Sequence, residues 1–316
     1  MNHKLPKIAI VVPCYNERET LARTNAELTA LINRMSDASE LSSDSFILYV
    51  DDGSRDGTWE LIESFAEGSE ALHGVKLAAN AGQQNALIAG LNEVADSCDA
   101  VITLDADLQD DIDVIPQMVS QFKKGYEIIY GVRNNRDSDT WFKHKSAQCF
   151  YRMMKNLGVD TVYNHADFRL MSTAIVKDFL LYDERNIFIR GIIPGLGRRQ
   201  TSVYYDRKPR TAGTTKYPFK KMVNFAVDGI TSFSVRPVRM VFFLGLGFLL
   251  VALGIFIYVL IRYFSGETIE GWTSLILSIW FCTGVVLLSL GIIGEYIGKI
   301  YTEVKHRPRY SIEKRK

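Results

Sequence analysis

The sequence contains few cysteines, and none of them lies in a paired spacing. The four are far apart and form neither a CxxC motif nor the His/Cys spacing of a metal site. One of them falls in a long apolar stretch that no aqueous oxidant reaches. We therefore expect free thiols in a reducing compartment rather than a disulfide framework. The four are Cys14, Cys98, Cys149 and Cys282.

Two glycine-rich phosphate-binding motifs are also missing. No GxGxxG follows the first strand-like run, and no GxxxxGK(S/T) occurs anywhere in the 316 residues. These absences argue against a dinucleotide-dependent oxidoreductase and a P-loop NTPase. An excess of charge of either sign is missing as well, since 37 Lys and Arg face 36 Asp and Glu. The net charge therefore points to no nucleic acid partner.

The N-terminal region lacks the apolar core of a signal peptide. Lys4 and Lys7 are followed by only five apolar residues, 8–12, before a proline. That run is too short for a signal peptide and fits a buried strand.

Long apolar runs are absent from the first two thirds of the chain and appear near its C-terminus. Residues 241–261, preceded by Pro237, and residues 272–293 are each long enough to cross a bilayer as a helix. The linker 262–271 carries one Arg, whereas the tail 299–316 carries seven Lys and Arg. The positive-inside rule therefore predicts an integral membrane protein with two spans and both termini in the cytoplasm. Two buried helices of a soluble protein are the alternative.

Two further patterns accompany these runs. Apolar residues recur at helical spacing over 219–233, which predicts an amphipathic helix in the membrane interface, with a core helix of the soluble domain as the alternative. Glycines also recur along both runs, and small residues allow close contact between membrane helices, within one chain or in a homo-oligomer. These glycines are Gly247, Gly254, Gly284, Gly291, Gly294 and Gly298.

Strand-like and helix-like segments alternate over the first 130 residues. Short β-rich runs occupy residues 8–12, 46–50, 75–77, 100–104 and 127–130. Helical patterns lie between them at about 18–35, 58–67, 84–95 and 114–123. This alternation predicts an α/β domain with a mostly parallel sheet and helices on both faces. Ligands of such sheets bind outside the carboxyl ends of the strands.

Polar clusters follow each of the five predicted strands directly. They cover residues 13–17, 51–54, 80–83, 105–107 and 131–133. Because the carboxyl ends of parallel strands share one edge of the sheet, we expect these clusters to form one site.

The residues of these clusters suit a nucleotide and a metal. Asp51 and Asp52 can accept hydrogen bonds from a base or a ribose. Asp105, Asp107 and Gln109 offer hard oxygen ligands at alternate positions, as Mg²⁺ or Mn²⁺ requires when it also binds substrate phosphates. A solvated acidic turn is the alternative interpretation. The next two residues, Asp110 and Asp111, are expected to start a helix, where negative charge is favourable.

These motifs, in this order, resemble glycosyltransferase family 2. They read VPCYNE at 12–17, VDDGSRDGT at 50–58, NAGQ at 80–83, DADLQ at 105–109 and DFRL at 167–170. With the two apolar C-terminal runs, the chain is most similar to polyisoprenyl-phosphate glycosyltransferases, which include bactoprenol glucosyltransferases and dolichol-phosphate mannose synthases. RTAGTTKY at 210–217 resembles an Arg-x-x-Gly-x-Ser/Thr-Lys-Tyr element of that group. The resemblance implies a Rossmann-like GT-A fold, a nucleotide-sugar donor, a divalent cation and a lipid-phosphate acceptor, in a bacterial inner membrane.

The resemblance also implies a role for individual residues. The predicted catalytic residues are Asp167, Asp107 and Arg133. Those predicted to bind the nucleotide sugar are Pro13, Tyr15, Asn16, Glu17, Asp51, Asp52, Gln83 and Asp105. Those predicted to bind the lipid phosphate are Arg169, Arg207, Arg210 and Lys216, and those predicted to bind the metal are Asp105, Asp107 and Gln109. The sequence around Asp167 lacks the glycine that often precedes this aspartate in relatives.

The charge distribution agrees with an acidic lipid acceptor. Residues 183–221 contain ten Lys and Arg against three acidic residues, directly before the predicted interfacial helix. Such a segment suits a lipid phosphate, which arginine can bind through two hydrogen bonds. General attraction to anionic lipid is the alternative for most of these residues.

The expected reaction is attack of a lipid phosphate oxygen on the anomeric carbon of the sugar, with inversion. The resemblance makes Asp167 the base, but a phosphate monoester is largely ionised at pH 7, so Asp167 can instead orient the sugar or fix Arg169. UDP-glucose is the first choice of donor, with UDP-N-acetylglucosamine and GDP-mannose as alternatives. A non-catalytic nucleotide-sugar sensor also stays open. A processive synthase lacks its Gln-x-x-Arg-Trp element here, and a two-span transporter lacks charges within the spans.

Four regions are predicted along the chain. Residues 1–210 form the cytoplasmic catalytic domain, and residues 211–238 form a basic loop and the interfacial helix. Residues 239–298 form two transmembrane helices, and residues 299–316 form a basic cytoplasmic tail.

Overall fold

A computed structural model describes residues 5–134, 165–185, 187, 189–206, 236–265 and 271–316. The chain divides into two compact units. The first comprises residues 1–152, 160–216 and 307–316, and the second comprises residues 153–159 and 217–306.

The first unit is built on one mixed sheet of eight strands in the order β7-β5-β6-β4-β1-β2-β3-β8. Four neighbouring pairs are parallel, namely β1 with β2, β1 with β4, β2 with β3 and β5 with β7. Strand β6 is antiparallel to both of its neighbours, and β8 is antiparallel to β3. The strands are β1 (Ile8–Cys14), β2 (Phe46–Asp51), β3 (Leu72–Leu77), β4 (Ala100–Thr103), β5 (Ile128–Arg133), β6 (His165–Ser172), β7 (Gln200–Tyr205) and β8 (Ile312–Arg315).

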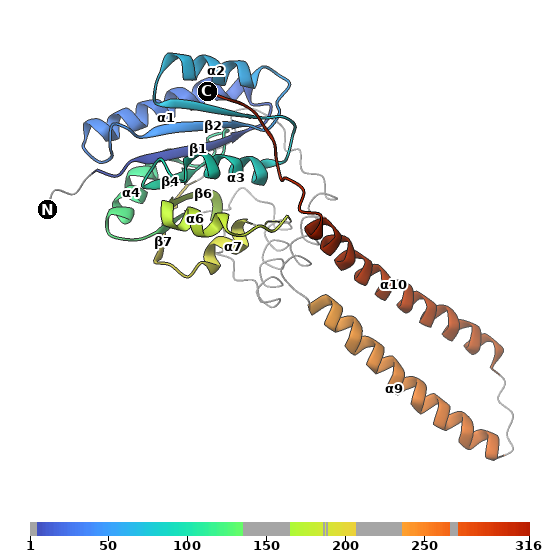
Figure 1. Cartoon of the computed structure of the whole chain (residues 1–316). Coiled ribbons are helices and arrows are strands. Elements are labelled where there is room, and N and C mark those ends of the chain that lie inside the picture. The colour runs from blue at the N-terminus through green and yellow to red at the C-terminus, as the bar shows by residue number, and fades with distance from the viewer. Residues whose placement is uncertain (1–4, 135–164, 186, 188, 207–235, 266–270) are drawn as a thin grey trace. The chain divides into compact units, whose positions relative to one another are not determined.

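Helices cover both faces of this sheet (Figure 1). On one face, Ile8, Ile10 and Val12 of β1 share a buried core with Leu21 and Leu28 of the first helix, because alternate residues of a strand point to the same face. The helices that contribute to this core are α1 (Arg18–Asp37), α2 (Thr58–Gly68) and α4 (Ile115–Lys123), the last preceded by the short 3₁₀ helix η1 (Ile112–Val114).

The opposite face is covered by α3 (Gln83–Val94), which packs closely on β1 and contacts α6 (Thr173–Leu180). A Cβ atom on Gly90 would lie only 2.4 Å from Val11 Cγ1, so glycine permits this close approach of helix and strand. The predicted α/β architecture, a mostly parallel sheet with helices on both faces, is confirmed. The predicted segments agree with the strands β1 to β5 and the four helices α1 to α4 within about three residues.

The C-terminal residues return to the first unit and add the edge strand β8 to the sheet. Arg315 pairs with Val75 of β3, and Ile312 pairs with Leu77. Ion pairs join Lys76 to Glu313 and Arg315 to Glu93. The sequence predicts only a basic tail here, because four residues with three charges carry no strand pattern of their own.

The second unit contains two long helices, α9 (Arg236–Phe264) and α10 (Trp272–Val304), which lie side by side (Figure 1). The rings of Phe248 and Phe281 are in edge contact, with centroids 5.3 Å apart. Among the described residues, one segment, Phe281–Val304, is long and apolar enough to cross a membrane, and α9 contains the shorter apolar segment Gly245–Ile255. The described residues therefore support one of the two predicted membrane spans. The predicted interfacial helix at 219–233 lies outside the described residues.

Candidate functional site

The loops after β1, β2 and β4 meet because these three strands are neighbours in the sheet. A hydrogen bond from Gln83 Nε2 to Asp105 Oδ1, 2.7 Å long, joins the start of α3 to the loop after β4. Pro13, Gln83, Asp105 and Asp167 line one small pocket at this edge. The structure thus brings together polar residues that the sequence places at the carboxyl ends of separate strands.

Asp51 and Asp52 lie in the loop after β2 and are almost completely buried. Asp51 Oδ1 accepts a hydrogen bond from Ser54 N, 3.2 Å away, while Asp51 Oδ2 has no partner among the described residues. Both oxygens of Asp52 accept backbone hydrogen bonds, from Ala81 N at 2.7 Å and Gly82 N at 3.0 Å. Burial raises the pKa of both carboxyl groups. Asp52 therefore positions the loop before α3, and Asp51 presents a buried oxygen to which no described residue donates a hydrogen bond.

Gly53 makes the close approach of these two loops possible. Its φ of +70° is unfavourable for other residues, and a Cβ atom there would lie 2.7 Å from Asn80 N.

The loop after β1 is held against the loop after β2. Asn16, with a φ of 54°, donates its backbone N–H to Ser54 Oγ and accepts from Arg55 N through Oδ1, each at 2.9 Å. Glu17 N donates to Thr58 Oγ1 at 3.0 Å. Tyr15 is exposed beside them. The predicted nucleotide-sugar residues of β1 and β2 are therefore neighbours.

The loop after β4 gathers carboxylates. Asp105 lies close to three others, and burial together with the charges of Asp167, Asp110 and Asp107 raises its pKa to about 7. The side-chain amide of Gln109 donates to Asp107 Oδ2, and Gln109 N donates to Asp107 Oδ1 at 3.3 Å. Gln109 is buried, and it holds Asp107 through both of these hydrogen bonds.

The carboxylates around Asp105 suit a divalent cation. Among the described residues, no group of three or more His, Cys, Asp or Glu side chains is arranged to hold a metal alone. Asp105 and Asp107 nevertheless offer hard oxygen atoms where negative charge is in excess, and Mg²⁺ or Mn²⁺ often combines one or two carboxylates with substrate phosphates.

Asp110 does not start a helix, contrary to the sequence-based expectation. It is buried and accepts hydrogen bonds from Arg133 Nη2 at 2.8 Å and Tyr205 Oη at 2.5 Å. Asp111 does occupy the N-cap of η1, where its side chain accepts from Asp113 N. Asp110 is bound in this way because Arg133 of β5 and Tyr205 of β7, which are remote in sequence, lie beside it in the sheet. Arg133, predicted to face the leaving diphosphate, is bound to Asp110 in this structure.

Asp167 lies between two arginines. It is on β6, and Arg169, two residues further, points to the same face of the strand. Arg169 Nη2 donates to Asp167 Oδ1 at 2.6 Å. Arg190, on the short helix α7 (Ile189–Gly195), donates to the same carboxylate from Nε at 3.0 Å and from Nη2 at 2.8 Å. The sequence predicted no individual role for Arg190, because nothing local distinguishes it from the other basic residues of its segment.

Arg169 is completely buried, with a side-chain exposure of 0%, and burial lowers the pKa of its guanidinium. Its predicted contact with a lipid phosphate therefore has no accessible atom in this structure. The reason is the position of β6 inside the sheet, between β4 and β5. Of the other predicted lipid-phosphate residues, Arg207, Arg210 and Lys216 lie outside the described residues.

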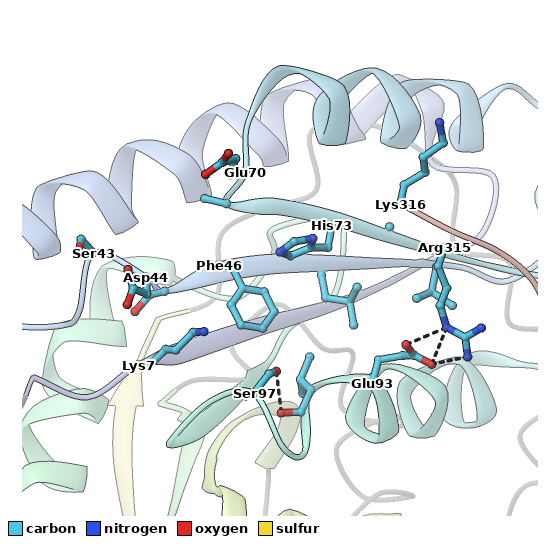
Figure 2. Close-up of a pocket in the computed structure, with 16 residues that line it drawn as sticks. Lys7, Ser43, Asp44, Phe46, Glu70, His73, Glu93, Ser97, Arg315 and Lys316 are labelled. Carbon is cyan, nitrogen blue, oxygen red and sulfur yellow. Dashed lines mark hydrogen bonds and ion pairs between the residues drawn. The ribbon is translucent and has the colours of Figure 1, made fainter.

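A separate cavity of about 560 Å³ lies at the amino ends of β1, β2 and β3, away from these loops (Figure 2). Phe46 and His73 line it, as do Glu93 and Arg315, which form an ion pair. Ligands of parallel sheets bind at the carboxyl ends of strands. The candidate active site is therefore the edge that carries Asp51, Asp105 and Asp167, the carboxylate edge.

Comparisons with known proteins agree with this assignment. The family model of glycosyl transferase family 2 matches residues 9–180. The chain is 48% identical to the glycosyltransferase YkoT of Bacillus subtilis over 99% of this chain and 93% of the relative. It is 36% identical to the SfII prophage-derived bactoprenol glucosyl transferase of Shigella flexneri, covering 98% of both.

Solved structures with lower similarity include mannosyl-3-phosphoglycerate synthase from Rubrobacter xylanophilus. It is 16% identical, with a TM-score of 0.48 over 74% of each chain. From the family model and the near full-length relatives, we conclude that the chain is a glycosyltransferase and belongs to glycosyl transferase family 2.

Proposed function

We propose that this enzyme transfers a sugar from a nucleotide-sugar donor, first choice UDP-glucose, to a polyisoprenyl phosphate such as undecaprenyl phosphate at the cytoplasmic face of the membrane. The observation that carries the proposal is the similarity to bactoprenol glucosyl transferases over nearly the whole chain, C-terminal helices included. A carboxylate-rich edge of a mostly parallel sheet supports it.

The donor would bind along the loops after β1, β2 and β4, in a GT-A type arrangement. Pro13, Tyr15, Asn16, Glu17 and Asp51 would contact the donor. Asp51 Oδ2, buried without a donor among the described residues, suits an N–H or O–H group of the nucleoside. Asp52 contributes by fixing the loop that carries Gln83.

Asp105 and Asp107 would hold Mg²⁺ or Mn²⁺, and Gln109 would orient Asp107. A bound cation supplies charge stabilisation to the leaving diphosphate. Arg133, which is partly exposed and paired with Asp110, would add positive charge for the same purpose.

In the proposed reaction, an oxygen of the lipid phosphate attacks the anomeric carbon. The bond from that carbon to the donor diphosphate breaks, and the nucleoside diphosphate leaves with the electron pair, which inverts the configuration. A phosphate monoester has a second pKa near 6 and needs little deprotonation at pH 7. Because two arginines already bind the Asp167 carboxylate, we assign Asp167 an orienting role rather than that of a base.

The second unit would anchor the enzyme, with α9 and α10 as two spans and both termini in the cytoplasm. Residues 265–271, between the two helices, contain no Lys or Arg, whereas the residues after α10 are basic. Arg207, Arg210 and Lys216, together with an amphipathic helix at 219–233, would receive the lipid head group. A homo-oligomer through the membrane helices belongs to the same proposal.

A reconstituted assay tests the function and the choice of donor. Purified full-length protein is incubated with Mg²⁺ or Mn²⁺, undecaprenyl phosphate and labelled UDP-glucose, UDP-N-acetylglucosamine or GDP-mannose. We expect label in the lipid extract from UDP-glucose, and loss of that label when EDTA is added. Label from another donor would correct the sugar, and absence of lipid label from every donor would reject the function.

A further inference from the structure

An acceptor phosphate faces an electrostatic obstacle at the candidate site. Asp107, Asp110 and Asp167 lie around Asp105, so a phosphate dianion that comes close to the Asp105 carboxylate meets like charge. A guanidinium that reaches the acceptor phosphate would offset this repulsion.

Three arginines of the described residues, Arg133, Arg169 and Arg190, pair with Asp110 or Asp167, and they differ in accessibility. The Arg169 side chain is 0% exposed and cannot contact an external ligand. The Arg133 side chain is 24% exposed and is bound to Asp110 through Nε and Nη2. The Arg190 side chain is 38% exposed, which makes it the most accessible of the three guanidinium groups.

The position of Arg190 is well determined by its neighbours. Ile189, the preceding residue, donates its backbone N–H to Gln84 Oε1 at 3.3 Å, which ties α7 to the start of α3. Ile189 also lines the pocket shared by Asp105 and Asp167. Arg190 approaches Asp167 side-on, with Nε and Nη2 contacting different carboxylate oxygens. Because a guanidinium has five N–H donors, it can hold a carboxylate and contact a phosphate at the same time.

We propose that Arg190 binds the acceptor phosphate, and that Asp167 and Arg169 are positioning residues that aim it. This inference rests on the proposed function. Arg169 holds Asp167 from inside the sheet, and Asp167 in turn fixes the guanidinium plane of Arg190 at the exposed side. The chain of three charges places a preformed phosphate donor set beside the carboxylates that serve the sugar donor.

Lysine cannot reproduce this geometry. Its ammonium is a single point of charge, so Arg190→Lys keeps the ion pair with Asp167 but loses the planar, two-point contact. Arg190→Gln removes the charge entirely. Arg198→Gln is a matched control, because Arg198 belongs to the same basic segment, is 43% exposed, and pairs with Asp178 instead.

The test compares these variants as full-length proteins in the lipid-transfer assay. We expect Arg190→Gln to raise the KM for undecaprenyl phosphate about tenfold or more, since a hydrogen bond to a charged group is lost. Arg190→Lys should give a smaller rise in the same KM. The KM for the nucleotide sugar, and the affinity for UDP with Mn²⁺ measured by calorimetry, should stay within about twofold in both. Arg198→Gln should match the wild type.

The outcomes separate the two proposals. Wild-type transfer with an unchanged lipid KM in Arg190→Lys and Arg190→Gln would overturn the role of Arg190 and leave the function intact. Equal losses for donor and acceptor would do the same, because they indicate a structural role. Absence of wild-type transfer from any donor would instead reject the proposed function itself. If Arg190→Gln fails to fold, Arg190→Lys, which keeps the charge beside Asp167, decides the question.

Discussion

Two edges of the same sheet gather charged residues, and they do so in opposite ways. At the carboxylate edge, Asp51, Asp110 and Arg169 are buried, and like charges lie side by side. At the β8 edge, Lys314, Arg315 and Lys316 remain 40–61% exposed and pair with glutamates. Exposed pairs contribute little to stability, whereas breaking a buried pair is costly. Burial of the charged side chains, rather than their number, therefore distinguishes the candidate site from the solvated surface at β8.

The strongest test of the comparison is the buried pair at Asp167. Asp167→Asn leaves the fully buried guanidinium of Arg169 without a carboxylate. We expect transfer to be abolished and the free energy of unfolding to fall by about 3 kcal/mol. Lipid-transfer assays and thermal unfolding followed by circular dichroism measure the two effects. Near-normal turnover would remove Asp167 from the functional residues, and an unchanged unfolding midpoint would show that Arg169 does not depend on it.

The second test concerns Asp107, a carboxylate that is expected to act in the reaction rather than in stability. Asp107→Ala removes one of the two proposed metal ligands, and we expect transfer to fall about a thousandfold while the protein stays folded. Asp113→Ala is the control, because Asp113 follows in the same segment but is an exposed partner of Arg34. Equal activity in both variants would refute the metal-binding role of Asp107.

A third test uses the buried oxygen of Asp51. Because burial raises its pKa, Asp51 contributes stability that is present at low pH and lost as the pH rises through its folded-state pKa. Asp51→Asn should therefore not lower the unfolding midpoint at pH 7, and its advantage over the wild type should shrink at acidic pH. Affinity for the donor nucleotide should fall about tenfold, since a hydrogen bond to a charged group is lost.

The control for this variant is Asp44→Asn, which changes an exposed aspartate. It should alter neither nucleotide affinity nor the pH dependence of unfolding. A lower midpoint at pH 7 in Asp51→Asn, with unchanged affinity, would make Asp51 a structural residue.

The smallest effect is expected at the β8 edge. Arg315→Ala removes an exposed partner of Glu93, and we expect the unfolding midpoint to change by less than about 2 °C, with transfer unchanged. A large loss of stability would mean that the tail strand contributes more than its exposed ion pairs indicate, and would contradict the contrast between the two edges.

Much of the first unit was predictable because its signals are local. Alternating segments indicated β1 to β5 and the helices α1 to α4, and the polar residues after the strands indicated the edge that carries Asp51 and Asp105. Strand β8 was not predictable, since its charged residues become a strand only by hydrogen bonding to β3. The separate roles of Asp110, Arg169 and Arg190 were hidden for a similar reason, because each depends on a partner from another strand or helix.

The sequence by itself determined the family, the mostly parallel α/β sheet and the edge that carries the candidate site. Motif order and hydrophobic periodicity are sufficient for these, because they depend on residues near one another in the chain. Tertiary structure decided which charges are buried and with whom they pair. It placed the buried Arg169 and the partly exposed Arg190 on the same Asp167 carboxylate. Burial and ion pairing of this kind depend on distances between residues that are remote in sequence.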